Sequence, residues 1–271
     1  MFLIILNSKS MMISKKYFVM YLLLLFLAGC SEEREVDFPL DDLSGKIVIE
    51  GNVTDASGPY FVKVTRSGKV TESNNILPVS NATVVLSDNN GQTDILKYEH
   101  GEYHTVNFTT NYGNIYTLSV TVDGVTYKAV SKMPEKVPFT GLVQKDIHYE
   151  YVTWKDIVPV FTDPAAEGNY YLFKTYRGNY PALITLFSDY TGNGQVNVKP
   201  LNSNFSGEGE VYVEMQCVDV AVYNYFKALP QVNIDNSGGD VTHVNPVSNI
   251  SNGALGYFSA HTSAVKSIII Q

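Results

Sequence analysis

The stretch IYTLSVTV-DG-VTYKAVS, residues 115–131, decides the fold class. Side chains alternate between the two faces of a β-strand, so the first half of the stretch has one apolar face. That face consists of Tyr116, Leu118, Val120 and Val122. Asp123-Gly124 favours the positive φ angles of a type I′ turn. The stretch therefore predicts an antiparallel hairpin with one buried face.

The same pattern extends in both directions from this hairpin. From residue 44 onward, short runs rich in Val, Ile, Tyr and Thr alternate with Gly, Asn, Asp, Ser and Pro clusters, which is typical of a sandwich or barrel. We expect further strands at 46–53, 60–66, 82–87, 94–98, 103–108, 158–162, 169–176, 183–187, 195–198, 211–218 and 266–271. Pro134 and Pro138 remove backbone donors, which places a domain boundary there. The chain is predicted to be all-β, with two β-sandwich-like domains at 44–136 and 137–271.

One segment of the second domain breaks the strand period. Asp219 is a suitable N-cap, and Pro230 would end the helix that follows. The apolar stripe of this helix would be Val222, Tyr225, Phe226 and Leu229. We expect one short helix over an end of the β core. Cys217 lies on the apolar side of the preceding strand and is expected to be an inert core residue.

Charge and composition exclude several classes of protein. The charged residues before Cys30 are Lys9, Lys15 and Lys16. The chain from Cys30 onward therefore carries 16 basic and 27 acidic residues, a formal charge of −11. That balance argues against nucleic acid as a partner. The 45% hydrophobic content excludes intrinsic disorder, and two cysteines exclude a disulfide scaffold.

The N-terminal sequence predicts where in the cell the protein is located. Lys15-Lys16 precede an uncharged apolar run over residues 17–29, which is typical of a secretory signal peptide. The run ends in Leu27-Ala28-Gly29-Cys30, which resembles a bacterial lipobox. We expect residues 1–29 to be the signal peptide, cleavage between Gly29 and Cys30, and acylation of Cys30. An ordinary signal peptide with a chance cysteine is the alternative, and the start codon could be that of Met1, Met11 or Met12.

Residues 30–43 form a polar and acidic segment. It is interpreted as a flexible tether, too charged to pack into a core. Glu32 and Glu33, directly behind Cys30, resemble the surface-export signal of Bacteroidetes lipoproteins. The sequence thus predicts an outer-membrane location, anchored by lipid and facing the cell exterior.

Two stretches resemble known families. Residues 48–55, 78–84, 101–103 and 116–118 follow the rhythm G-x-V-x-D, A-x-V, G-x-Y and Y-x-L, which resembles the immunoglobulin- or transthyretin-like module of bacterial surface proteins. Residues 223–225 and 245–258, the latter containing NISNGALGYF, together with the lipobox resemble the Bacteroidetes lipoprotein family called domain of unknown function 4249. Membership implies an outer-membrane lipoprotein often encoded beside a TonB-dependent receptor, and it implies no catalytic residues. From the residues alone, 249–258 is expected to be a packed loop rather than a ligand site.

The sequence contains no clear catalytic or metal-binding motif. Glu99, His100, Glu102 and His104 lie close together, but Gly101 predicts a turn, so an exposed polar hairpin is preferred to a metal site. There is no HExxH, no paired CxxC and no Gly-x-Ser-x-Gly, and no cofactor is implied. Asp189–Gly194 is interpreted as a turn rather than a calcium loop.

Three aromatic residues among charged ones form the candidate ligand-binding set. They are Tyr149, Tyr151 and Trp154. Aromatic platforms suit amphipathic ligands, although an amphipathic strand with core-facing rings is the alternative. We expect a non-enzymatic surface lipoprotein that serves a TonB-dependent nutrient-uptake system as an accessory or ligand-binding subunit, its ligand unknown. The alternative is a structural adhesin or fimbria-like subunit.

Overall fold

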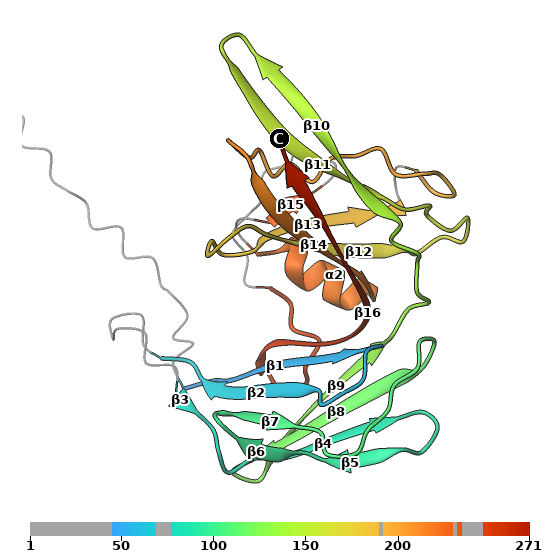
Figure 1. Ribbon diagram of the computed structural model, residues 1–271. Helices are drawn as coiled ribbons and strands as arrows, with labels where there is room; N and C mark the ends of the chain where they lie inside the picture. The colour runs from blue at the N-terminus through green and yellow to red at the C-terminus, as the bar shows by residue number, and fades with distance from the viewer. Residues whose placement is uncertain (1–44, 69–76, 190–191, 230–231, 235–245) are drawn as a thin grey trace, which may run out of the picture. The chain divides into compact units, whose positions relative to one another are not determined.

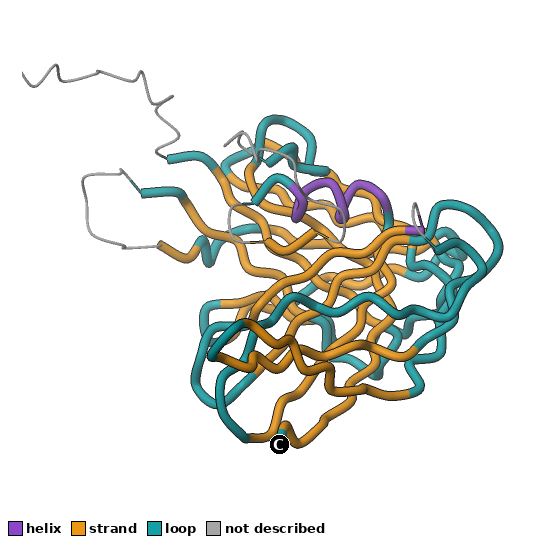
Figure 2. The backbone as a smooth tube through the Cα atoms, turned by 90° about the horizontal axis from the view of Figure 1, so that it is seen from above, coloured by secondary structure: helices purple, strands orange, loops and turns teal. Residues whose placement is uncertain are grey.

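The computed structural model describes residues 45–68, 77–189, 192–229, 232–234 and 246–271 (Figure 1). These residues form an all-β, sandwich-like fold, as the sequence predicts, and strands and loops make up most of it (Figure 2). Their one α-helix is α2 (Val220–Lys227). The predicted signal peptide, Cys30, the acidic tether, Pro230 and His243 lie outside the described residues. The described part contains no helix of the length and apolarity needed to cross a membrane.

The hairpin of residues 115–131 forms as predicted. Its apolar face is buried, and Asp123 and Gly124 have φ angles of 50° and 79°. It is half of a four-stranded antiparallel sheet. In spatial order the strands are β5 (Thr93–Ile95), β4 (Thr83–Asp88), β8 (Ile115–Val122) and β9 (Val125–Lys132).

A second sheet packs against this one around a shared apolar core. It is one half of a ten-stranded sheet, and the strands of this half are β16 (Leu255–Ile270), β1 (Ile47–Thr54), β2 (Phe61–Arg66), β7 (Glu102–His104) and β6 (Lys97–Glu99), with β3 (Leu77–Pro78) beside β2. The core also contains Ile250, Ala254, Phe258 and Ala260, so the C-terminal segment completes this sandwich. The strand predicted at 266–271 is thus the end of a longer one that begins at Leu255.

Strand β16 continues into the second half of the fold (Figure 1). Its first part pairs with β1 in parallel, and its second part pairs with β14 in antiparallel. The strands beyond it are β14 (Gly209–Val218), β12 (Tyr170–Tyr176), β13 (Leu183–Ser188) and β15 (Val232–Ile234). A two-stranded sheet, β10 (Gly141–Tyr149) and β11 (Val152–Val160), shares a second core with them. The domain boundary at residue 137 stays a prediction.

Helix α2 begins at the predicted N-cap, but its buried face includes Tyr223, whereas Tyr225 and Leu229 of the predicted stripe are only partly buried. The Asp219 side chain caps it by accepting a hydrogen bond from the Val222 amide at 2.9 Å. Val222, Tyr223 and Phe226 are buried against β12 and β13 in a third apolar cluster. Cys217 is buried as expected, and burial raises the pKa of its thiol.

The structure differs from the predicted strands at residues 94–98, 103–108 and 195–198. Of residues 103–108, only Tyr103 and His104 lie in a strand, at the end of β7. Residues 94–98 form two strands in different sheets, because the chain crosses between layers at buried Leu96. Residues 195–198 form only an isolated bridge, Thr162 to Val196. The amphipathic strand given as the alternative for residues 148–156 does not form as one strand, because the turn between β10 and β11 follows Tyr149.

Candidate functional site

The three predicted ligand-binding residues lie on the β10–β11 hairpin. Tyr149 ends β10 opposite Val152, and Trp154 is opposite Ile147. Tyr151 lies in the turn with 96% of its surface exposed, and Trp154 is partly buried. The Tyr151 ring therefore does not face the core. Binding at this hairpin stays a prediction, and the pockets described below are lined by other residues.

A row of outward-facing side chains crosses four neighbouring strands of the first sandwich. Glu50 on β1 is paired in register with Tyr257 on β16 and with Lys63 on β2. The Lys63 Nζ atom lies 3.1 Å from Glu102 Oε1 on β7. Because Ile49 is buried, strand alternation points Glu50 away from the core.

A second row lies beside the first. Asn52 is opposite Phe61, and Phe61 is opposite His104. Phe61 is 48% exposed, and its ring centroid lies 6.4 Å from that of His104. The Asn52 Nδ2 atom donates to the Tyr257 hydroxyl at 3.3 Å, which joins the two rows.

Side chains of both rows line a groove of about 470 Å³. We call it the polar groove, and its lining from the two rows is Glu50, Asn52, Phe61, Lys63, Glu102 and Tyr257. Thr54, Pro59 and Tyr60 complete the lining. Its size lies in the range of small-molecule sites, and it combines aromatic surface with directed polar groups.

The charges of the polar groove are unevenly matched. Lys63 and Glu102 neutralise each other, whereas Glu50 has no hydrogen bond or ion pair within the described part of the chain. Burial raises the pKa of Tyr257, and the Glu50 charge adds to this although the Asn52 hydrogen bond opposes it. Burial, with a contribution from Glu50, raises the pKa of Tyr225 to about 12. The Glu50 carboxylate thus lies near two phenol groups whose ring centroids are 5.2 Å apart.

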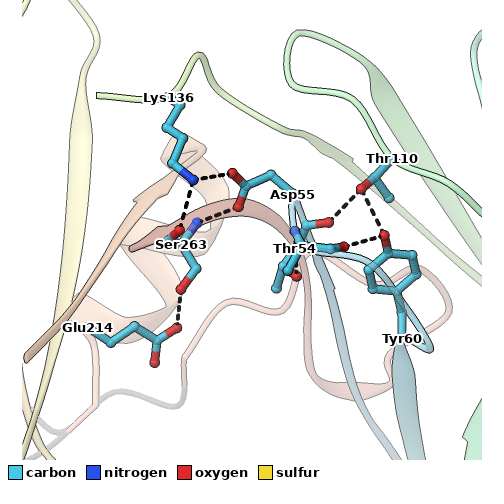
Figure 3. Close-up of polar contacts among 8 residues, drawn as sticks. Thr54, Asp55, Tyr60, Thr110, Lys136, Glu214 and Ser263 are labelled. Carbon is cyan, nitrogen blue, oxygen red and sulfur yellow. Dashed lines mark hydrogen bonds and ion pairs between the residues drawn. The ribbon is translucent and has the colours of Figure 1, made fainter. Parts of the chain in front are cut away.

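One end of the groove is held by hydroxyl contacts (Figure 3). The Tyr60 hydroxyl and Thr110 Oγ1 lie 2.9 Å apart, and Thr110 Oγ1 donates to the Thr54 carbonyl at 2.6 Å. These bonds tie the end of β1 to a loop of the same sandwich. Such links restrict Thr54 and Tyr60, which line the groove, and so favour a preformed site.

The residue after Thr54 anchors a charged network (Figure 3). Asp55 Oδ2 lies 2.6 Å from Lys136 Nζ, and Asp55 Oδ1 accepts from the Ser263 amide at 2.8 Å. Ser263 Oγ donates to Glu214 Oε1 at 2.8 Å. The network joins β1, the segment after β9, β16 and β14, so its role is to hold the strands beside the groove.

The C-terminal motif, residues 249–258, contributes both to the packed core and to the lining of the polar groove. Asn249 exchanges two side-chain hydrogen bonds with the backbone of Phe258, at 2.7 and 2.9 Å. Phe258 is fully buried but lies in β16, which begins at Leu255, so the loop expected over residues 249–258 ends at Ala254. The next outward residue, Tyr257, turns to the polar groove. The sequence signal that could have revealed the groove is the polar alternation of Glu50 and Asn52 along β1.

A second pocket, of about 510 Å³, lies in the other half of the fold. Its Asp163 carboxylate accepts hydrogen bonds from the Tyr171 hydroxyl and the Gly194 amide. Asp189 accepts from two backbone amides. Burial and the Asp163 contact raise the pKa of Tyr171. Because these carboxylates already hold the surrounding loops, the polar groove is the stronger candidate.

The histidine and acidic cluster does not gather into a metal centre. His100 and Gly101 have φ angles of 51° and 91°, which is the turn that the sequence predicts. Glu102 pairs with Lys63, and His104 Nε2 is 3.9 Å from Glu99 Oε2. Within the described ranges, no three His, Cys, Asp or Glu side chains form a group that could hold a metal ion.

Fold and site together define a class: an all-β, sandwich-like protein with a polar and aromatic groove on the outer face of one sheet. The chain belongs to the family described as Domain of unknown function (DUF4249), whose model matches residues 33–267. This confirms the family that the C-terminal motif indicates. No curated protein matches the chain.

Proposed function

We propose that this protein is a lipid-anchored, surface-exposed outer-membrane protein that serves a TonB-dependent nutrient-uptake system as a non-enzymatic accessory or ligand-binding subunit. In this proposal Cys30 carries the lipid, residues 30–43 are the tether, and the first sandwich is an immunoglobulin- or transthyretin-like module of a Bacteroidetes lipoprotein. Membership of the DUF4249 family and the lipobox-like Leu27-Ala28-Gly29-Cys30 support it.

The polar groove is the observation that carries the ligand-binding part. It lies on a sheet whose neighbouring strands hold its side chains in register, and its end is held by the Tyr60 and Thr110 hydroxyls. A binding domain on a flexible tether raises the local ligand concentration near a transporter without requiring tight affinity. The geometry therefore suits capture and delivery.

The edges of the two larger sheets weigh against the fimbria-like alternative, whereas those of the two-stranded β10–β11 sheet, with nine residues in each strand, do not. Subunits that assemble by strand donation need a free edge. Strands β6, β15 and β5, at the ends of the two larger sheets, have three residues each. Strand β9 is covered, because Ser251 bonds to Lys128 and Asn252 bonds to the Thr126 carbonyl. Short or covered edges resist pairing with another chain.

Co-purification tests the proposal. The affinity-tagged full chain is produced in its host, the membranes are dissolved in mild detergent, and the bound proteins are identified. We expect a TonB-dependent receptor to be recovered with the chain and not with an unrelated tagged lipoprotein. Repeated recovery of no such receptor would contradict the proposed function.

A further inference from the structure

We propose that the polar groove binds an organic cation, a primary ammonium or guanidinium group on an apolar stem, with Glu50 as the counter-charge and the rings of Tyr257 and Phe61 as the apolar walls. The inference rests on the proposed ligand-binding function and names the ligand class. No residue of the groove was assigned to a ligand by the sequence.

The first support is the charge that the groove leaves unmatched. Lys63 faces Glu50 across the strand pair, yet its Nζ atom is 3.1 Å from Glu102 on the other side. Glu50 is exposed and has no partner in the described part of the chain. An added cation at this place gains a carboxylate without displacing an existing ion pair.

The second support is the aromatic surface beside that carboxylate. Tyr257 is the register partner of Glu50. Its ring packs at a tilt against that of Tyr225 and edge-on against that of Phe226, at centroid distances of 5.2 and 4.9 Å. Phe61 adds an exposed ring on the neighbouring row. Ring faces attract cations, and rings also cover the methylene stem of a lysine- or arginine-like group.

The third support is the long-range field. From Cys30 onward, the part that remains after the proposed cleavage, the chain carries a formal charge of −11, which favours the approach of cationic ligands over anionic ones. A neutral sugar would also use rings and carboxylates, but it would gain nothing from the unmatched charge of Glu50. The cation is therefore the ligand class that uses every feature of the groove.

Titration calorimetry with the full chain in detergent tests the inference. The probes are Gly-Lys-Gly and Gly-Arg-Gly with N-acetylated and C-amidated ends, the free diamine cadaverine, neutral Gly-norleucine-Gly blocked in the same way, and maltotriose. We expect at least one cationic probe to bind at least tenfold more tightly than the neutral peptide and the sugar. Binding of only the peptides would indicate a peptide ligand, and equal binding of cadaverine would indicate free amines; both outcomes support the class. Affinity should fall several-fold between 50 and 500 mM NaCl, because salt screens exposed charges.

Variants separate the role of each group. Glu50→Gln should weaken cation binding about five- to tenfold, and Glu102→Gln should weaken it too because it frees the Lys63 charge. Glu210→Gln, an exposed carboxylate on β14, is the matched control and should leave affinity unchanged. Tyr257→Phe should retain binding because the ring remains.

Two results would overturn the inference: no cationic probe binds the folded chain, or binding is equal for neutral probes and unaffected by Glu50→Gln. The proposed function would survive either result if a TonB-dependent receptor still co-purifies. Loss of that co-purification with cation binding intact would instead contradict the proposed function alone.

Discussion

At position 256 the chain has no room for a side chain. A Cβ atom there would lie 2.1 Å from the carbonyl oxygen of Ile49, and the φ angle is +92°. Parallel pairing of β1 and β16 brings these backbones together. Gly256→Ala should therefore destabilise the fold severely, by about 4 kcal/mol or more, through combined clash and backbone strain.

Urea unfolding measures this loss. Gly253→Ala is the matched control, because Gly253 has a φ angle of +72° but open space around its Cβ position. It should cost only about 1 kcal/mol, the cost of an L-residue in this region. Equal losses of unfolding free energy for the two variants would show that the close approach to the Ile49 carbonyl does not contribute to the destabilisation.

His261 makes the fold sensitive to acid. Burial lowers its pKa from 6.5 to about 4; Lys174 acts in the same direction, whereas Glu214 and Asp55 oppose it. The unfolded chain therefore takes up a proton below pH 6.5 while the folded chain does not, so stability falls as the pH drops from 6.5 to 4. The loss should be about 1 kcal/mol per pH unit in the middle of this window and smaller at its two ends.

Denaturant unfolding at pH 7.5, 6.5, 5.5 and 4.5 checks this prediction. His261→Gln cannot titrate, so its stability should change less over this window, whatever its stability at pH 7.5. A slope identical to that of the wild type would assign the acid sensitivity to other groups.

At the scale of elements, the start of α2 offers a direct test, because one side chain there joins the helix to strand β9. Asp219 caps the helix and also accepts a hydrogen bond from Ser131 Oγ on β9 at 2.5 Å. Ser131 Oγ in turn accepts from the Ala260 amide of β16 at 2.9 Å. Asp219→Ala should lower the free energy of unfolding by about 2 kcal/mol. It removes the helix cap, and it leaves the buried Ser131 hydroxyl without the carboxylate that accepts its hydrogen bond.

Thermal and urea unfolding should show a smaller loss for Asp219→Asn, whose amide oxygen can still cap the helix. If Asp219→Ala unfolds at the same urea concentration as the wild type, the cap contributes nothing to stability.

For the whole molecule, the proposed lipid anchor gives a direct test. Cys30→Ala should abolish acylation, since only the thiol can form the thioether to the lipid. Each buried CH₂ of an acyl chain contributes roughly 0.8 kcal/mol, so several chains hold a protein on a membrane lastingly. Labelling with palmitate and fractionation should find the variant unlabelled and released from the membrane fraction. Cys217→Ala is the control and should stay labelled, because Cys217 is buried.

Surface exposure is a separate prediction. Added proteinase should remove the wild-type protein from intact cells. Replacing Glu32 and Glu33 by Ala should leave the protein lipidated but protected, because the acidic export signal is lost. Full protection of the wild type would contradict the surface location while leaving the lipid anchor in place.

Local patterns were enough to predict the kind of element at many positions. The alternation in residues 115–131 with Asp123-Gly124 predicted a hairpin that the structure confirms, and Asp219 marked the start of α2. Both signals act within a few residues, where side-chain period, turn chemistry and capping decide the backbone. The sequence by itself therefore determined the all-β class, the helix and the family motif.

Only the tertiary structure decided which distant segments meet. Asn52 and Tyr257 are 205 positions apart, yet they bond across the polar groove because β16 pairs with β1. Nothing local distinguishes β16 from a strand that serves one sheet, and nothing local predicts that residues 94–98 divide between two sheets. Pairing partners are chosen by the burial of whole faces and by the entropy of closing long loops, which no short window of sequence contains.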